Sequence, residues 1–149
     1  MYEVINAIME AISISLYAEF GDTCEIYREV KKQGLKEPCF FIQCLNPTNK
    51  LFFPKRYFRQ NQFCIQYFPR EEQHENKECY DIGEQLFSCL EYLEVDNSLV
   101  MGTKMRYEVV EGILHFFVNY DMFVYKAGKS LPVMEEVSSK ITGKGQEKE

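Results

Sequence analysis

The sequence predicts an α+β fold, in which a mainly antiparallel β-sheet carries an N-terminal helix and a central helix packed on it. Three observations lead to this fold class. Apolar residues recur with helical spacing in two segments and alternate with polar residues in most of the others. These segments follow one another as helix, strands, helix, strands, an order typical of α+β domains. Aromatic residues, which strands favour, make up 15% of the chain.

The first half of the chain predicts one helix followed by strands. Within residues 3–20, Ile8, Ile12 and Leu16 recur every three or four positions, and Gly21 follows directly. We therefore expect a helix that ends at a left-handed glycine. After it we expect strand 24–30, then a turn with Gly34 and Pro38, and then strand 39–45, which is covered on both faces. A turn at 46–50 follows, and after it come strands 51–58 and 62–68. Pro54 restricts the first of these two strands to an edge or a bulge.

The second half predicts a further helix and a β-meander. Ile82, Leu86, Leu90 and Leu93 lie at helical spacing and predict a helix over residues 80–94. The other expected elements are an exposed polar segment at 69–79, a loop at 96–98, a strand at 99–111, a turn at Gly112 and a strand at 113–125.

The length of 149 residues is sufficient for one stable domain. We expect a single α+β domain over residues 1–126 and a C-terminal extension over 127–149 that is partly disordered from about residue 138. No apolar stretch approaches the roughly 20 residues that cross a bilayer, and the N-terminus lacks the basic start of a signal peptide. We therefore expect a cytoplasmic protein with no membrane partner, in which the six cysteines are thiols.

Charge is unevenly distributed along the chain. Residues 24–70 carry nine basic and three acidic side chains, whereas the rest of the chain carries eight basic and twenty acidic ones. The overall charge of −6 argues against generic binding to duplex DNA, which requires clustered cations. Opposite charges on two parts of a chain can pair one copy with another, or they can pair within one copy. Both explanations stay open.

The segment 55–69, "KRYFRQNQFCIQYFP", combines cations with aromatic residues. Such a composition suits a surface that binds single-stranded nucleic acid, with Arg56, Tyr57, Arg59 and Phe63 as stacking and phosphate-binding groups. The alternation instead directs Phe63 and alternate residues after it into the core of a strand. This leaves the cations at the start of the segment to bind a ligand, a partner protein or water.

The sequence gives little support for catalysis or a cofactor. His74 and His115 are the two histidines, the first in a charged segment and the second on a strand, and neither has an evident nucleophile beside it. There is no glycine-rich phosphate loop and no CxxC pair of the kind that structural zinc sites show. We expect no enzyme activity, no cofactor and no metal.

The succession of elements resembles a known family. The resemblance rests on four phrases in this order: "QGLKEPCFFI", "RYFRQNQFCIQYFP", "LFSCLEYLEV" and "YEVVEGILHFFVNYDMFV". With these phrases, residues 1–126 resemble the tail terminator, or tail completion, proteins of phages and prophages of low-GC Gram-positive bacteria. The resemblance implies a structural protein with an antiparallel sheet and flanking helices. Such proteins form a ring, commonly a hexamer, that caps the finished tail tube, stops its polymerisation and presents a surface to the head connector.

The resemblance also implies the partners. These are further copies of the chain, the tail tube protein, the head-tail connector protein and DNA that only passes through the ring. The expected location is the host cytoplasm during assembly and then the virion tail. A head-to-tail ring needs two different patches on each subunit. The residues that we expect at such an interface are Lys31, Lys32, Lys36, Lys55, Arg56, Tyr57 and Arg59.

Overall fold

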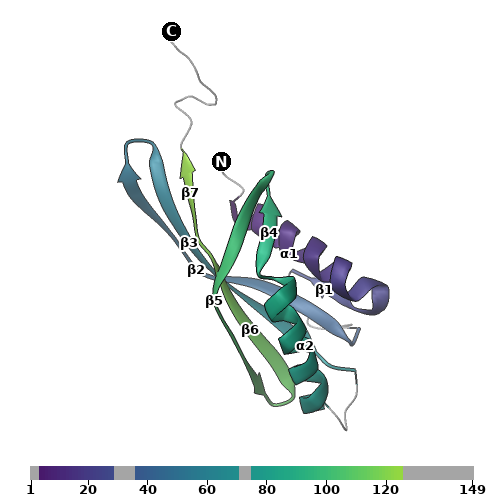
Figure 1. Cartoon of the computed structure of the whole chain (residues 1–149). Coiled ribbons are helices and arrows are strands. Elements are labelled where there is room, and N and C mark those ends of the chain that lie inside the picture. The colour runs from purple at the N-terminus through teal and green to yellow at the C-terminus, as the bar shows by residue number, and fades with distance from the viewer. Residues whose placement is uncertain (1–3, 29–35, 71–74, 126–149) are drawn as a thin grey trace. The chain divides into compact units, whose positions relative to one another are not determined.

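A computed structural model describes residues 4–28, 36–70 and 75–125 (Figure 1). The chain divides into two compact units, which we treat separately. The large unit contains the described residues from 4 to 47 and from 60 to 121, and the small unit contains residues 48–59 and 122–125. The elements are α1 (Val4–Phe20), η1 (Gly21–Thr23), β1 (Glu25–Tyr27), β2 (Cys39–Phe53), β3 (Arg56–Phe68), α2 (Glu75–Cys89), β4 (Tyr92–Val95), β5 (Ser98–Val110), β6 (Ile113–Tyr120) and β7 (Met122–Tyr125).

Helix α1 is a core helix of the large unit. Its buried residues are Val4, Ile8, Ala11, Ile12 and Leu16, the stripe that the apolar spacing predicts. The helix ends at Gly21, whose φ of +67° confirms the predicted left-handed position. Residues 4–23 have the length and composition of a membrane span, so the expectation that no such segment occurs is wrong. One face of this helix, the stripe named above, is buried in the large unit.

The strands form a mixed, mainly antiparallel sheet, and the predicted α+β class is confirmed. Along the sheet the order is β1-β2-β3-β6-β5-β4, and β7 pairs with β3. The pairing of β1 with β2 is parallel, whereas β6 is antiparallel to both β3 and β5. In the large unit, β6 alternates regularly, because Leu114, Phe116, Val118 and Tyr120 are buried and the residues between them are half-buried.

Helix α2 packs on β5 and β6 of the large unit. The ring of Phe87 lies 5.3 Å from that of Phe116 and 5.5 Å from that of Tyr107, measured between centroids. Gly83 allows this close approach, because a Cβ at its position would lie 2.8 Å from the Tyr107 ring. The buried face of the sheet and the two helices therefore enclose the core of the large unit.

The predicted turn at 46–50 is wrong. Strand β2 continues without reversal from Cys39 to Phe53, and the chain turns at Pro54 and Lys55 instead. Asn46 has a φ of +48°, a left-handed conformation that asparagine tolerates well. The turn-forming residues are therefore accommodated by a local backbone distortion within a strand, and the predicted strand 51–58 is two strands joined by a tight turn.

The predicted bounds of the second helix are also wrong. Helix α2 begins at Glu75 rather than at 80 and ends at Cys89, and Tyr92–Val95 is strand β4. Leu90 and Leu93 are fully buried, so their spacing continues the apolar pattern of the helix. Because the helical spacing of buried residues continues into β4, apolar spacing alone could not locate the end of α2.

One buried polar residue fixes the chain where β3 and β6 pair in the large unit. Asn61 is fully buried, and its Nδ2 donates a hydrogen bond of 3.0 Å to the Tyr120 carbonyl oxygen. Its backbone N–H donates to Oδ1 of Asp121 over 3.2 Å. Buried polar groups that are hydrogen-bonded in this way favour one register of neighbouring strands over others.

Candidate assembly interface

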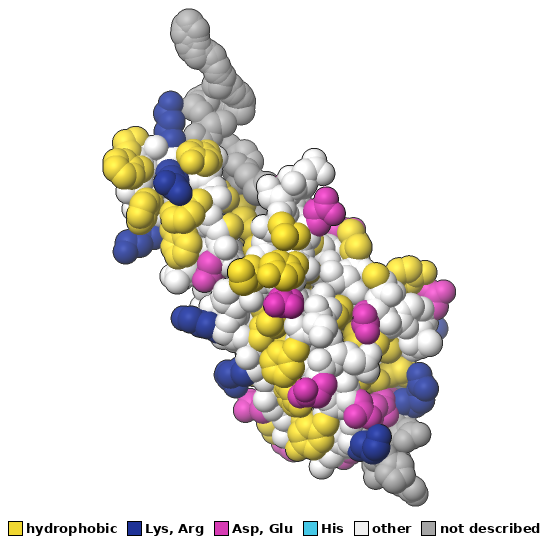
Figure 2. Space-filling model, viewed as in Figure 1, with side chains coloured by type: hydrophobic (Ala, Val, Ile, Leu, Met, Phe, Trp, Pro, Cys, Tyr) yellow, Lys and Arg dark blue, Asp and Glu magenta, His cyan; other side chains and the backbone are white. Residues whose placement is uncertain are grey.

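The small unit exposes an apolar and cationic surface. It contains four basic residues and no acidic one in residues 48–59 and 122–125. Its exposed apolar side chains are Leu51, Phe52, Phe53 and Tyr125, each more than half accessible, and Phe123 at 41%. Figure 2 shows the apolar side chains in yellow and the cations in dark blue at the upper left. Exposed apolar groups that cluster in this way are characteristic of interaction surfaces.

Arg56 lies at the centre of this surface. Its guanidinium carbon is 4.1 Å from the centroid of the Phe123 ring, 5.7 Å from that of Phe52 and 5.9 Å from that of Tyr125. The Nε atom is buried and has no hydrogen-bond partner among the described residues. The three ring faces form cation–π contacts with the guanidinium, each worth about 0.5–2 kcal/mol. These contacts offset part of the free energy needed to remove the charge of Arg56 from water.

Three rings of the small unit also contact one another. Phe123 lies 4.8 Å from Phe58 and 5.3 Å from Phe52, measured between ring centroids. Strand pairing explains the first contact, because Phe58 and Phe123 are directly opposite each other in β3 and β7. Phe123 is thus the residue on which the aromatic contacts of this unit converge.

The predicted interface residues of the small unit do not share one face. The pairing places Arg56 opposite Tyr125 and places Tyr57 and Arg59 on the other face of the strand. The Nε of Arg59 donates a hydrogen bond of 2.9 Å to the Thr48 carbonyl oxygen. Lys55 is exposed in the turn at a φ of +65°. Arg56 and Arg59 therefore stabilise the unit, whereas Lys55 presents its charge to solvent.

Lys36 is the one further predicted interface residue that the structure describes. Lys36 is an exposed residue of the large unit, and its backbone N–H donates to the Tyr27 hydroxyl over 3.3 Å. Lys31 and Lys32 lie outside the described residues, as does His74. The expectation that these seven residues form one interface therefore stays a prediction.

The sequence reasoning missed six residues of the patch, namely Lys50, Leu51, Phe52, Phe53, Phe123 and Tyr125. The run "KLFF" at 50–53 could have indicated the first four, because adjacent apolar residues in a strand must include some that face solvent. Phe123 and Tyr125 join the patch only through the pairing of β7 with β3. Lys50 is exposed and forms no ion pair with another described residue. Lys50 and Lys55 are therefore the cations of this unit that can pair with a partner.

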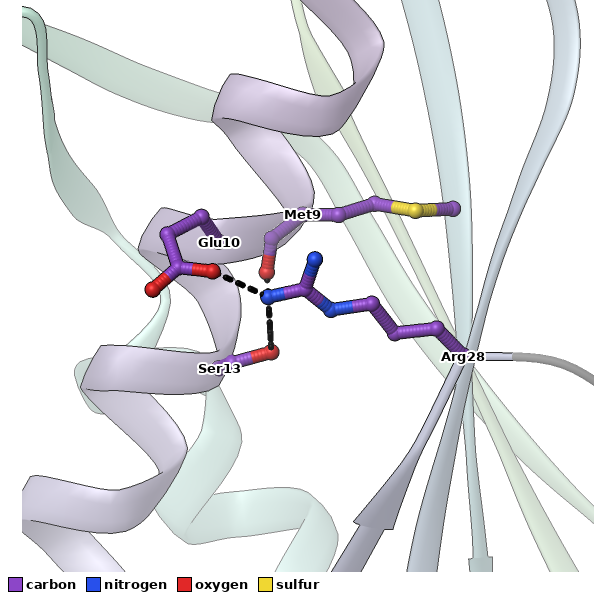
Figure 3. A network of polar contacts seen from close by, with 4 residues as sticks. All are labelled: Met9, Glu10, Ser13 and Arg28. Carbon is purple, nitrogen blue, oxygen red and sulfur yellow. Dashed lines mark hydrogen bonds and ion pairs between the residues drawn. The ribbon is translucent and has the colours of Figure 1, made fainter.

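Part of the positive charge of residues 24–70 is paired within the large unit. Figure 3 shows Arg28 beside helix α1, where its Nη2 donates to Oε1 of Glu10 and, over 3.4 Å, to Oγ of Ser13. This ion pair holds the end of β1 against α1. Intramolecular pairing, one of the two explanations for the uneven charge, thus applies to Arg28.

The histidine and cysteine residues that the structure describes have structural surroundings. Nδ1 of His115 lies 3.2 Å from Nε2 of Gln66 across the β3–β6 pair. No group of three His, Cys, Asp or Glu side chains suited to a metal ion occurs among the described residues. The two sulfur atoms of Cys79 and Cys89 each lie 3.5 Å from a backbone carbonyl oxygen, those of Gly112 and Ser15 respectively.

The buried thiols should resist alkylation in the folded protein. Burial raises the pKa of Cys39, Cys64 and Cys79 from 9.0 to about 11, because the thiolate is poorly solvated there. A rise of two units lowers the thiolate fraction at pH 8 by about 100-fold. We expect iodoacetamide at pH 8 to leave these three cysteines unmodified by mass spectrometry, while urea-unfolded protein reacts fully. Rapid modification of Cys64 in folded protein would contradict this.

The same pKa shifts predict a loss of stability in alkali. Folded thiols keep their protons up to about pH 11, whereas unfolded ones begin to ionise near pH 9. Below pH 9 both states are protonated and the thiols do not affect the free energy of unfolding. As the pH rises from 9 through 11, the thiols of the unfolded state ionise while those of the folded state stay protonated. This lowers the free energy of the unfolded state alone, so the free energy of unfolding falls. Urea unfolding followed at pH 8, 9.5 and 10.5 would measure this fall, and a constant free energy of unfolding across this range would contradict it.

The fold and the described surface define the class: an α+β protein that exposes an apolar and cationic patch. A comparison with protein families is consistent with this class. The model of a family described as "Phage tail terminator protein" matches residues 7–132. The chain belongs to the phage tail terminator family and has a structural role in the phage tail. Its location is therefore the virion tail, among other tail components. A comparison with curated proteins found no match.

Proposed function

We propose that this protein caps the tail tube as a homo-oligomeric ring, ends tube polymerisation and joins the tail to the head connector. The match to the tail terminator family over residues 7–132 carries this proposal. The protein would assemble in the host cytoplasm before it becomes part of the virion. Its work consists of binding rather than catalysis, and it needs no cofactor.

The small unit supports an assembly role. A ring of identical subunits requires that one patch on each copy bind a different patch on the next. Lys50, Lys55 and the exposed rings of the small unit supply one such patch. We propose that Arg56, Tyr57 and Arg59 contribute to it by holding the strands in place, and that Lys31, Lys32 and Lys36 lie at the interface as well.

The proposed ring would surround the path of DNA. The net charge of −6 suits a channel through which DNA passes without tight binding, since tight binding needs neutralisation of phosphates by clustered cations. A single-stranded nucleic-acid binder, the alternative function, needs free ring faces for stacking. Phe63, one of the rings expected to stack on bases, is fully buried, which favours the assembly role.

Tail tubes provide the test of this function. Tubes polymerised from the tube protein of the same phage should stop elongating when this protein is added, and negative-stain images should show a ring at a tube end. Tube lengths measured with and without the protein give the size of the effect. Bare ends and unchanged tube lengths at saturating protein would contradict the proposal.

A further inference from the structure

The hairpin of β4 and β5 in the large unit carries a second exposed patch. Tyr92 is paired with Met101, and Glu94 is paired with Leu99, so these four side chains lie on one face. Leu93, Val95 and Val100 on the opposite face are buried. Tyr92, Leu99 and Met101 are exposed at 48%, 71% and 51%, unusually high values for large apolar side chains.

The charge of this hairpin is opposite to that of the small unit. Residues 91–101 contain Glu91, Glu94 and Asp96 and no basic residue. All three acidic side chains are exposed, and none forms an ion pair with another described residue. Figure 2 shows acidic and apolar side chains over this part of the large unit. The small unit has the matching combination of exposed apolar groups and cations.

The hairpin is also well ordered for binding. Asp96 and Asn97 both have positive φ values, +51° and +65°, as in the two-residue turns that best fit twisted antiparallel strands. The Gly102 N–H donates a hydrogen bond of 2.7 Å to the Glu91 carbonyl oxygen and anchors the start of the hairpin. A patch that is already ordered loses little conformational entropy on binding.

From this complementarity we infer that the small unit of one copy docks on the β4–β5 hairpin of a second copy. Apolar side chains of both patches become buried in this contact, and Lys50 and Lys55 face Glu91 and Glu94. The contact joins two different patches, so it is head-to-tail and propagates around a ring. The inference rests on the proposed function, because it identifies the contact by which the proposed ring forms.

Helix α1 is another surface of the large unit that combines exposed apolar and acidic side chains. It exposes Ile14 and Tyr17, and its acidic residues include Glu10 and Glu19. Glu10 is already paired with Arg28. The hairpin has three exposed apolar side chains adjacent on one face and unpaired acids, so it is the better match for the small unit.

Charge reversal on each patch tests the contact. One variant carries Lys50→Glu and Lys55→Glu, and the other carries Glu91→Lys and Glu94→Lys. These exposed side chains can be changed without disturbing the core, which thermal unfolding would verify. Sedimentation velocity should show that each variant alone associates about tenfold more weakly than wild type or worse, because like charges then face each other. An equimolar mixture of the two variants should regain assembly, because every contact in an alternating ring again joins opposite charges.

Two matched controls locate the effect. Lys77→Glu with Lys104→Glu makes the same charge change as the first variant, and Glu19→Lys with Asp22→Lys makes the same change as the second on the segment of helix α1 and η1. Both should assemble like wild type. Loss of assembly in the α1 and η1 control but not in the hairpin variant would overturn the inference in favour of that surface.

Other outcomes separate this inference from the proposed function. The inference is overturned if wild type stays monomeric at every concentration, if both reversed variants assemble normally, or if their mixture fails to assemble. In each case capping of tail tubes by wild type would still support the proposed function. Charge-dependent assembly without any effect on tube length would support the contact and contradict the capping role.

Discussion

Replacement of Phe123 by alanine should disorder the small unit and abolish binding to tail tubes. Phe123 contacts the Arg56 guanidinium at 4.1 Å and the rings of Phe58 and Phe52 at 4.8 and 5.3 Å. Aromatic pairs contribute about 0.5–1.5 kcal/mol each beyond their buried area, and the cation–π contact adds a similar amount. A combined loss of about 2–3 kcal/mol is severe for a few strands that are marginally stable alone.

Hydrogen exchange measured by mass spectrometry would show the effect of Phe123→Ala. Amides of residues 48–59 should exchange faster, whereas those of α2 and β6 in the large unit should keep their protection. Phe53→Ala is the matched control, because Phe53 is 64% exposed and its ring contact with Phe52 is long, at 6.3 Å. Unchanged protection of residues 48–59 in the Phe123 variant would show that these contacts do not order the unit.

Replacement of Gly102 by alanine should strongly destabilise the large unit. A Cβ at this position would lie 2.8 Å from the Leu90 carbonyl oxygen and 2.9 Å from Cγ2 of Val118. The Leu90 oxygen also accepts a 2.6 Å hydrogen bond from the buried Tyr120 hydroxyl, so it cannot move without cost. We expect a loss of about 3 kcal/mol, which lowers the unfolding temperature by roughly 6–12 °C in a chain of this size.

Differential scanning calorimetry of Gly102→Ala would give this shift directly. Thr103→Ala is the neighbouring control, since Thr103 is exposed and its hydroxyl makes one hydrogen bond of 3.4 Å, to the Asn119 carbonyl oxygen. It should unfold at nearly the same temperature as wild type. If Gly102→Ala unfolds at the same temperature as wild type, Leu90 and Val118 can move away from position 102 at little cost.

The apolar periodicity of the chain predicted much of the fold. It located α1 and its Gly21 end, the strand before Gly112, and the burial of Phe63, Ile65 and Tyr67. These elements are long and strictly periodic, so local sequence determines them. The one strand expected at 113–125 is wrong, because the chain breaks at Asp121 into β6 and β7. The single domain expected over residues 1–126 stays a prediction, and the extension expected over 127–149 lies outside the described residues.

The errors arose where tertiary context decides the outcome. Asn46 and Pro47 form a turn in many sequences, but here sheet pairing keeps them within β2. The end of α2 could not be found because Leu93 continues the helical spacing while it belongs to a strand. All of these errors concern the boundaries of elements, and none changes the fold class.

The candidate interface could be predicted in part. Sequence composition directed attention to residues 55–59, yet it could not show that Arg56 is stacked on Phe123, which is distant in the chain. Nor could it separate Lys55, which faces solvent, from Arg59, which binds the Thr48 carbonyl oxygen. Pairing between distant strands determines these roles, and one sequence does not reveal that pairing.

Hydrogen exchange in the assembled protein, compared with the dilute monomer, would test the central claim most directly. If copies of the chain associate through the small unit and the β4–β5 hairpin, residues 48–59 and 91–101 should gain protection together as the protein assembles. The outer face of α1 should exchange as it does in the monomer. Rings that form while both segments remain as exchangeable as in the monomer would contradict the account.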